Sequence, residues 1–424
     1  MNDLCIDIDY SQLYKHGQKI GGDVFFLDRA TGSNVITAIL SDGLGSGVRA
    51  NVLASLTSHM ASKLSLSPME LRRSAEVIMD TLPVDSVKGI SYSTFTIARI
   101  IFSDTKSFIR VELVEYDNPD SLRFSGAGPV EWKKESVRLR RKAAIKEEIV
   151  YSSTFEMKEG DRLIFFSDGV AQAGVSLGQA SEQRRDAAYT SFDQMPHRQK
   201  KAQPVTAKGW GLDNVTEYIS GSLKKEPDIS SRQLARDIVT QAYKYDGYKP
   251  NDDITCCVIS VRKPRRTLII TGAPRNRESD KKLGEIIRNF EGQIIVCGGT
   301  TAKIVARELG RDITADKSPA GGLPPSSVIE GIDLVTEGMI TLSAVADRLS
   351  KKVLLKEMNE DAAKRMIKLL RETDQIEIIA GTKINDELDD PATAAKIGLR
   401  FPVIDSISRS LRNNYFKECE VRYL

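Results

Sequence analysis

Histidine is almost absent from this sequence, with three among 424 residues. So few histidines exclude a histidine-rich zinc site and leave a Ser-His-Asp triad few ways to form. The five cysteines are odd in number and show no C-x-x-C spacing, which argues against a zinc knuckle or a disulfide framework. We therefore expect catalytic chemistry to rest on carboxylates, and the cysteine usage fits a reducing cytoplasm.

Long apolar runs and an excess of one charge are missing as well. No stretch approaches the ~20 apolar residues that a membrane-spanning helix needs, and the first residues lack the basic and apolar regions of an export signal. The 61 basic and 58 acidic residues give a formal net charge of +3, too balanced to indicate a nucleic acid or a membrane surface as a partner. A cytoplasmic protein that binds neither is expected.

Length and hydrophobic pattern together predict two domains. A chain of 424 residues exceeds what one core normally holds. Its first part, residues 1–262, reads as short strands, two helices and further strands, which is typical of an α+β domain. In residues 267–424, near-continuous apolar strands alternate with helical patterns. This second pattern predicts a smaller α/β domain with a mostly parallel sheet covered on both faces.

The sequence predicts the local structure of three segments of the first domain in more detail. Helical patterns over about 47–64 and 67–83 predict two consecutive helices. Alternating runs over 93–166 predict an antiparallel meander, and the polar segment over 179–208 is expected to be a solvated loop. One apolar face is predicted for the first helix, formed by Val48, Leu53, Leu56 and Met60.

Four aspartate-bearing motifs lie at or beside the ends of strand-like runs in the first domain. They are Gly21-Gly22-Asp23, Ser41-Asp42-Gly43-Leu44-Gly45-Ser46-Gly47, Ser167-Asp168-Gly169 and Asn251-Asp252-Asp253-Ile254-Thr255. Carboxylates presented from strand ends can converge although they are distant in sequence, and hard cations such as Mg²⁺ or Mn²⁺ need oxygen ligands. The motifs therefore predict a cation site. Each motif alone is also explained as a turn, a loop start or a solvated acidic pair.

A site of this kind suits the hydrolysis of phosphate esters. Two divalent ions about 3.5–4 Å apart can bind phosphate oxygens, lower the pKa of a bridging water and align it for in-line attack. The pair Asp42-Gly43 is the most informative, because an aspartate at a strand end can bridge two ions while the glycine lets its carbonyl approach one of them. Taken alone, this pair fits a glycine-rich strand-to-helix turn equally well.

The order and spacing of the motifs resemble those of SpoIIE-type serine/threonine phosphatases, the bacterial branch of the protein phosphatase 2C superfamily. Gly126-Ala127-Gly128-Pro129 and the run from Glu159 to Val170 belong to the same pattern. The resemblance covers about residues 5–262. It implies an α-β-β-α sandwich, in which two packed antiparallel sheets are flanked by helices, and a metal-dependent protein phosphatase activity.

The resemblance also implies roles for individual residues. Asp42 would bridge two Mn²⁺ or Mg²⁺ ions, with the Gly43 carbonyl and Asp23 beside one ion and with Asp168 and Asp252 on the other. Asp42, Asp168 and Asp252 form the expected catalytic set. Asp253 is counted with the metal-binding residues as a supporting residue, since eukaryotic relatives tend to have Asn there.

Two positions concern the substrate phosphate. Leu44 stands where some eukaryotic members place a histidine as a candidate general acid, so leaving-group protonation must come from metal-bound water or another residue. The sequence does not locate a phosphate-binding arginine, and Lys19 and Arg49 are the candidates for a phosphate-binding cation.

Partners follow mainly from the resemblance. SpoIIE-like phosphatases use the helices that correspond to residues 47–82 as a switch and for dimer contacts, so a homodimer is expected. By the same resemblance, the expected substrate is a phosphorylated protein such as an anti-sigma antagonist. A non-catalytic signalling or scaffold protein and a hydrolase of a small phosphorylated metabolite are the alternatives. In the second domain, Gly298-Gly299-Thr300-Thr301 follows a strand and either forms a tight turn or binds an anionic small molecule. We expect this domain to regulate the first.

Overall fold

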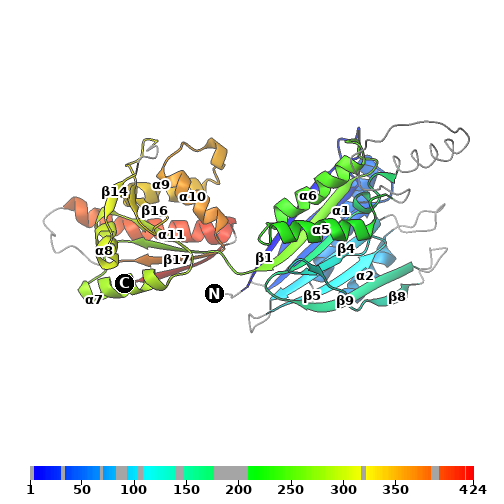
Figure 1. Ribbon diagram of the computed structural model, residues 1–424, viewed down its shortest axis with the longest axis horizontal. Helices are drawn as coiled ribbons and strands as arrows, with labels where there is room; N and C mark the ends of the chain where they lie inside the picture. The colour runs from blue at the N-terminus through cyan, green and yellow to red at the C-terminus, as the bar shows by residue number, and fades with distance from the viewer. Residues whose placement is uncertain are drawn as a thin grey trace, which may run out of the picture. The chain divides into compact units, whose positions relative to one another are not determined.

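The chain folds into two compact units that meet between Lys263 and Pro264 in the sequence. This computed structural model describes residues 4–29, 34–66, 70–82, 93–102, 108–139, 148–175, 209–316, 321–382, 391–415 and 417–424 (Figure 1). The polar loop expected over 179–208 and the start of the second predicted helix, residues 67–69, lie outside these ranges. Each unit is described by itself below.

Two antiparallel sheets form the first unit. The five-stranded sheet has the order β1-β11-β10-β6-β7, with β1 (Cys5–Leu13), β11 (Ile254–Arg262), β10 (Asp161–Phe166), β6 (Leu122–Ser125) and β7 (Gly128–Pro129). The six-stranded sheet has the order β2-β3-β4-β5-β9-β8, with β2 (Asp23–Arg29), β3 (Val35–Gly43), β4 (Ser93–Phe102), β5 (Ile109–Tyr116), β9 (Glu148–Met157) and β8 (Glu135–Leu139).

The predicted meander over 93–166 is wrong in one respect. Its strand pairs are antiparallel, as expected, but β4, β5, β8 and β9 lie in the six-stranded sheet while β6, β7 and β10 lie in the five-stranded one. Alternation of apolar and polar residues marks a strand without specifying its neighbours. The pairing instead follows burial, because β10 is buried along its whole length and occupies an interior position between β11 and β6.

The two sheets pack face to face and are covered by helices on their outer faces. Leu40, Leu163 and Phe165 belong to the core between the sheets. Apolar cores on the outer faces hold α5 (Leu212–Lys225) and α6 (Ser231–Tyr245) against the five-stranded sheet, and α1 (Gly47–Ser65) and α2 (Leu71–Thr81) against the six-stranded sheet (Figure 1). The predicted α-β-β-α sandwich is confirmed.

The predicted apolar face of α1 is wrong at Val48 and Leu56, whereas Met60 packs against the core beside the six-stranded sheet. Val48 and Leu56 are 63% and 48% exposed. Small or hydroxyl-bearing side chains form the buried face instead: Ala50, Ala54, Thr57, Ser58, Ala61, Ser62 and Ser65. The reason is close packing, because a Cβ atom on Gly43 would lie 2.0 Å from the carbonyl oxygen of Ala50. Where the helix lies this close to a strand end, only small side chains fit between them. Val48, Val52 and Leu56 are therefore exposed.

The second unit contains one seven-stranded sheet of order β14-β15-β16-β13-β12-β17-β18. Its strands are β14 (Ile313–Ala315), β15 (Ser327–Ile329), β16 (Leu334–Thr336), β13 (Gln293–Cys297), β12 (Arg266–Thr271), β17 (Gln375–Ala380) and β18 (Glu418–Tyr423). The run from β16 to β18 is parallel, whereas β14 and β15 pair antiparallel. The prediction of a mostly parallel sheet is confirmed, and β14, β15 and β18 are additions to it.

Helices cover both faces of this sheet, again as predicted. One face packs against α7 (Arg277–Asn289) and α8 (Gly299–Leu309), and the other against α9 (Met339–Ser350), α10 (Ala362–Glu372) and α11 (Pro391–Tyr415) (Figure 1). In the described part of the chain, no helix is both long and apolar enough to cross a bilayer.

Candidate functional site

The two sheets of the first unit each contribute carboxylates at their strand ends. Asp23 begins β2 and lies directly opposite Asp42 of β3 in the antiparallel pair, so both belong to the six-stranded sheet. From the five-stranded sheet, Asp168 follows β10 as the first residue of α3 (Asp168–Ala171), and Asp252 precedes β11. The motifs that the sequence singled out therefore come from strands of both sheets.

A cavity of about 700 Å³ brings most of the predicted residues together. Asp42, Gly43, Asp168 and Asp252 line it, and so does Leu44. Asp23 is not part of the lining; it is 3% exposed and stands behind the cavity wall, opposite Asp42.

Hydroxyl groups tie these strand ends to each other. The Ser167 hydroxyl accepts a hydrogen bond from the Thr255 backbone N–H at 3.0 Å, which joins the end of β10 to the start of β11. The Thr255 hydroxyl donates to Asp23 Oδ2 at 2.6 Å and links β11 to β2 across the two sheets. The position of Asp23 therefore depends on Thr255 of another motif. Both hydroxyl residues lie inside those motifs, but sequence reasoning gave them no role.

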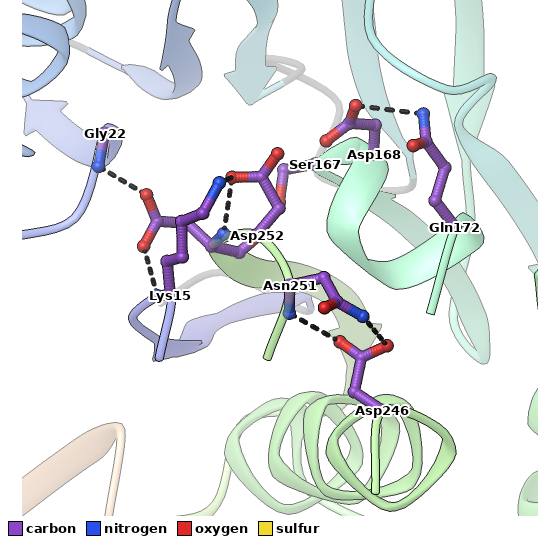
Figure 2. Close-up of polar contacts among 9 residues, drawn as sticks. Lys15, Gly22, Ser167, Asp168, Gln172, Asp246, Asn251 and Asp252 are labelled. Atoms are coloured by element: carbon purple, nitrogen blue, oxygen red, sulfur yellow. Dashed lines mark hydrogen bonds and ion pairs between the residues drawn. The ribbon is translucent and has the colours of Figure 1, made fainter. Parts of the chain in front are cut away.

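Asp253 holds a loop rather than facing the cavity. Its Oδ1 atom accepts the Lys15 backbone N–H at 2.8 Å, and its Oδ2 atom accepts the Gly22 backbone N–H (Figure 2). Both oxygens thus fix the segment between β1 and β2, 230 or more residues away in sequence. This geometry fits a supporting residue, and direct metal binding by Asp253 stays a prediction.

Two further side chains secure Asp168 and Asp252. Gln172 donates from Nε2 to Asp168 Oδ2 at 3.0 Å (Figure 2). Asp246, at the end of α6, accepts from the backbone N–H of Gly174 at 2.6 Å. It also accepts from the backbone N–H of Asn251 at 3.2 Å (Figure 2). Asp246 therefore connects the segment after Asp168 to the segment before Asp252.

Mutual repulsion and burial raise the pKa values of the carboxyl groups. Burial raises the pKa of Asp42 to about 7, with additional contributions from the charges of Asp168 and Asp252. The pKa of Asp168 is raised by burial and then by Asp252, and that of Asp23 by burial and then by Asp42. For Asp252, burial raises the pKa while Lys15 opposes the shift. Within the described ranges, Lys15 is the basic residue that lines this group of carboxylates.

The donor set fits hard divalent cations. Asp23 Oδ1 and Asp168 Oδ1 are buried and have no hydrogen-bond partner, so each keeps free lone pairs. Carboxylates and the Gly43 carbonyl are oxygen ligands of the type that Mg²⁺ and Mn²⁺ prefer. Among the residues that the structure describes, no three His, Cys, Asp or Glu side chains are grouped closely enough to hold an ion by themselves. Any ion here would therefore also need carbonyl or water ligands.

Sequence reasoning missed Lys15 as the basic side chain of the site. Lys15 lines the cavity, and its Nζ atom lies 3.9 Å from Asp252 Oδ1 (Figure 2). The predicted candidates Lys19 and Arg49 are exposed and do not line the cavity. No motif marks Lys15, because only the hydrogen bond from its backbone to Asp253 places it at this position.

Asp117 is a second lining residue without a predicted role. Its φ of 54° is unusual for a residue other than glycine, and such strain is often found at functional sites. Burial raises the pKa of Asp117, and the charge of Glu148 adds to the shift.

The raised pKa of Asp42 predicts an unusual dependence of stability on pH in metal-free protein. The unfolded pKa is near 3.9 and the folded one is about 7, so the folded state binds more protons between these values. The free energy of unfolding should therefore rise as the pH falls from 8 to 6. Asp42→Asn should be more stable than wild type at pH 8, on the order of 1–3 kcal/mol, and should lack this part of the rise.

Urea unfolding in EDTA at several pH values measures both effects. Asp213→Asn, which changes an exposed carboxylate on α5, is the matched control and should follow wild type. The same change in stability between pH 8 and pH 6 in all three proteins would contradict a raised pKa at Asp42.

Comparisons with known proteins place the first unit in a family. Residues 32–207 match the family model described as Stage II sporulation protein E (SpoIIE). A search of curated proteins gives no match.

Solved structures similar to this chain include phosphatase domains. The phosphatase domain of SpoIIE from Bacillus subtilis is 14% identical, with 62% of this chain and 95% of that chain covered and a TM-score of 0.39. RsbX in complex with magnesium is 17% identical (62% and 100% covered, TM-score 0.34), and the catalytic domain of the serine threonine protein phosphatase PstP with two manganese ions is 12% identical (61% and 100% covered, TM-score 0.35). The likeness rests on the family model, which relates residues 32–207 of this chain to the SpoIIE family.

Proposed function

We propose that the first unit is a metal-dependent phosphatase that hydrolyses phosphoserine or phosphothreonine in a protein substrate. The observation that carries this proposal is the cavity in which Asp42, Asp168 and Asp252 meet with raised pKa values and with the unpartnered Asp168 Oδ1. A buried group of like charges costs folding free energy, and such a cost persists where function requires it. The SpoIIE match supports the same chemistry.

Asp23, Asp42, the Gly43 carbonyl, Asp168 and Asp252 would hold two Mn²⁺ or Mg²⁺ ions. When bound, the ions supply an activated water and a positive charge for in-line displacement at phosphorus. The protein's own contribution is to fix these oxygens. Thr255 orients Asp23 and Gln172 orients Asp168, so that the ligands need little rearrangement.

Loss of a carboxylate should abolish metal-dependent hydrolysis. Asp42→Asn and Asp168→Asn should each lower the rate of Mn²⁺-dependent cleavage of an aryl phosphate and of a phosphoserine peptide by about 100-fold or more, because each removes an anionic ligand. The exposed-site variant Asp213→Asn should retain wild-type rates. Equal activity in all of these proteins would refute the proposal.

The same assay separates the alternatives. Cleavage of small phosphate esters without cleavage of phosphopeptides or a phosphorylated anti-sigma antagonist would favour a metabolite hydrolase. Absence of any Mn²⁺-dependent hydrolysis in folded wild-type protein would favour a non-catalytic scaffold.

Lys15 should bind the phosphate of the substrate. It is the basic residue among the cavity-lining side chains, whose other charged members are carboxylates. Lys15→Gln should raise KM for an aryl phosphate about 10-fold or more, as expected for the loss of a charge-assisted hydrogen bond. Lys15→Arg should restore most of the affinity, and Lys19→Gln should have no effect because Lys19 is exposed outside the cavity. A lower melting temperature with unchanged KM would instead assign Lys15 a structural role beside Asp252.

We also propose that α1 forms a contact between two copies of the chain and that this contact belongs to the regulation of the phosphatase. Val48, Val52 and Leu56 are 63%, 59% and 48% exposed. Their spacing of four residues places them in one stripe along the helix. The opposite face of α1 packs at Gly43, so a displacement of the helix would reach a predicted metal ligand.

Sedimentation velocity tests this contact. Wild-type protein should show a concentration-dependent dimer, and Val52→Asp should be monomeric because a charge in an apolar interface is unfavourable. Val328→Asp, at a 46% exposed position of the second unit, is the control and should still dimerise. A wild-type protein that stays monomeric at every concentration would contradict the proposal.

A further inference from the structure

Two loops of the first unit adjoin the cavity that holds the carboxylates. One comprises residues 14–22, between β1 and β2, and the other comprises residues 246–253, between α6 and β11. Each contributes a residue to the cavity lining, Lys15 from the first loop and Asp252 from the second (Figure 2). We call these two segments the rim loops, because they continue from the cavity wall onto the surface beside it.

Backbone hydrogen bonds join the rim loops to each other. The His16 backbone N–H donates to the Pro250 carbonyl at 2.9 Å. The Lys15 backbone N–H donates to Asp253 Oδ1 at 2.8 Å. The surfaces of the two loops are therefore held side by side, and a chain that contacts one loop is within reach of the other.

Large apolar side chains are exposed on both rim loops. Tyr14 and Ile20 of the first loop are 47% and 43% exposed, and Tyr248 of the second is 59% exposed. Single exposed apolar residues are ordinary on protein surfaces. These three, however, occur on two joined loops, and Tyr14 directly precedes the cavity-lining Lys15, so that their Cα atoms are about 3.8 Å apart. The rim loops thus place apolar surface directly beside the cavity.

The backbone of Tyr248 is in an unfavourable conformation. Its φ of 64° lies in the left-handed region, which costs free energy for an aromatic residue and suits Gly or Asn better. The Tyr248 backbone N–H donates to the Tyr243 carbonyl at 2.9 Å, and the two rings meet edge to face with centroids 5.2 Å apart. More than half of Tyr248 nevertheless remains exposed, so packing within the chain explains little of this cost. Such strain is typical of residues that bind a partner.

The ring of Tyr14 is held in place by the backbone of its own loop. A Cβ atom on Gly21 would lie 2.6 Å from Tyr14 Cδ1, so the ring lies directly against a residue without a side chain. A fixed aromatic ring loses little conformational entropy when a ligand covers it. Tyr14 is therefore preorganised to contact a ligand that leaves the cavity.

Outside the cavity, the lysines give the rim loops a positive charge. Lys19 and Lys249 are exposed. The carboxylates Asp246 and Asp253 of the same loops are buried and accept backbone N–H groups, while Asp252 lines the cavity. Within the rim loops, which the structure describes throughout, the lysines therefore face the solvent without an equally exposed carboxylate. This charge favours an acidic partner.

The size of the cavity limits how much of a protein substrate it can hold. Its volume of about 700 Å³ lies in the usual range for the site of one small ligand, about 300–1,000 Å³. It can hold a phosphorylated side chain, whereas the polypeptide on either side must continue outside. An extended chain advances about 3.3 Å per residue, so the first three residues beyond the phosphorylated one lie within about 10 Å of it. A chain with its phosphate at Lys15 therefore passes the rim loops.

We propose that the rim loops bind the polypeptide that flanks the phosphorylated residue of a protein substrate. Tyr14, Ile20 and Tyr248 contact apolar side chains of this polypeptide, and Lys19 and Lys249 contact acidic ones. The inference rests on the proposed phosphatase function and adds the substrate class: a phosphoprotein in which acidic and apolar residues flank the phosphorylated residue. Small phosphate esters do not extend beyond the cavity and make no use of this surface.

Hydrolysis of matched substrates tests the proposal. The Mn²⁺-dependent kcat/KM is measured for an aryl phosphate and for two phosphoserine peptides of equal length, one flanked by Glu and Leu and the other by Lys and Gly. Wild type should prefer the first peptide about 10-fold or more. Tyr248→Asn, which keeps a residue suited to the left-handed backbone, should lower kcat/KM for that peptide about 10-fold, because an aromatic contact is lost. Its rate with the aryl phosphate should be unchanged.

A second variant tests the charge, and a third serves as the control. Lys249→Glu should reduce the preference for the acidic peptide about 3-fold or more, as expected for an exposed ion pair, and should leave the aryl phosphate rate unchanged. Tyr423→Ala changes a tyrosine of the second unit that is also 59% exposed. This control should match wild type with all three substrates.

Equilibrium binding separates a failure of this proposal from a failure of the phosphatase function. Fluorescence anisotropy is measured with the acidic peptide carrying a non-hydrolysable phosphonate, which wild type should bind about 10-fold more tightly than Tyr248→Asn. This difference in a wild-type protein that hydrolyses no substrate would refute the phosphatase function and support the binding surface. Equal binding by the two proteins, no binding by wild type, or a proportional loss of aryl phosphate hydrolysis in Tyr248→Asn would overturn the proposal.

Discussion

The packing of two sheets against each other is the constraint on which the candidate site depends. Side chains such as Leu40 and Phe165 from opposite sheets share one core, and this core fixes the distance between the strand ends that carry Asp42 and Asp168. Without it, four carboxylates with raised pKa values would move apart. Hydrophobic packing of the two sheets thereby holds the carboxylates close together, although burial and mutual repulsion of their charges oppose this arrangement.

Sequence reasoning succeeded where local pattern determines structure. The strands, the sandwich and the parallel sheet were predictable, because alternation and continuous apolar runs reflect burial on one or two faces. It failed on α1, where a close approach at Gly43 reverses the usual rule that large apolar residues face inward. The sequence also could not predict that the strands of residues 93–166 divide between two sheets, because strand pairing depends on packing throughout the core and not on the local pattern.

The residues of the candidate site also fall into those that the sequence could predict and those that it could not. Asp23, Asp42, Asp168 and Asp252 stand in recognisable motifs, so their convergence could be anticipated. Lys15 and Asp246 could not, because their positions are set by hydrogen bonds to the remote Asp253 and to Gly174 and Asn251.

The pairing of β1 with β11 has a consequence for biosynthesis. Cys5 lies opposite Arg262, so the first and last strands of the first unit are neighbours although some 250 residues separate them. Contacts of such long range form late, because loop closure must be completed before they contribute. During translation, the chain has no complete set of site carboxylates until Asp252 and β11 have left the ribosome. A truncated or half-made product that lacks β11 therefore cannot assemble the site.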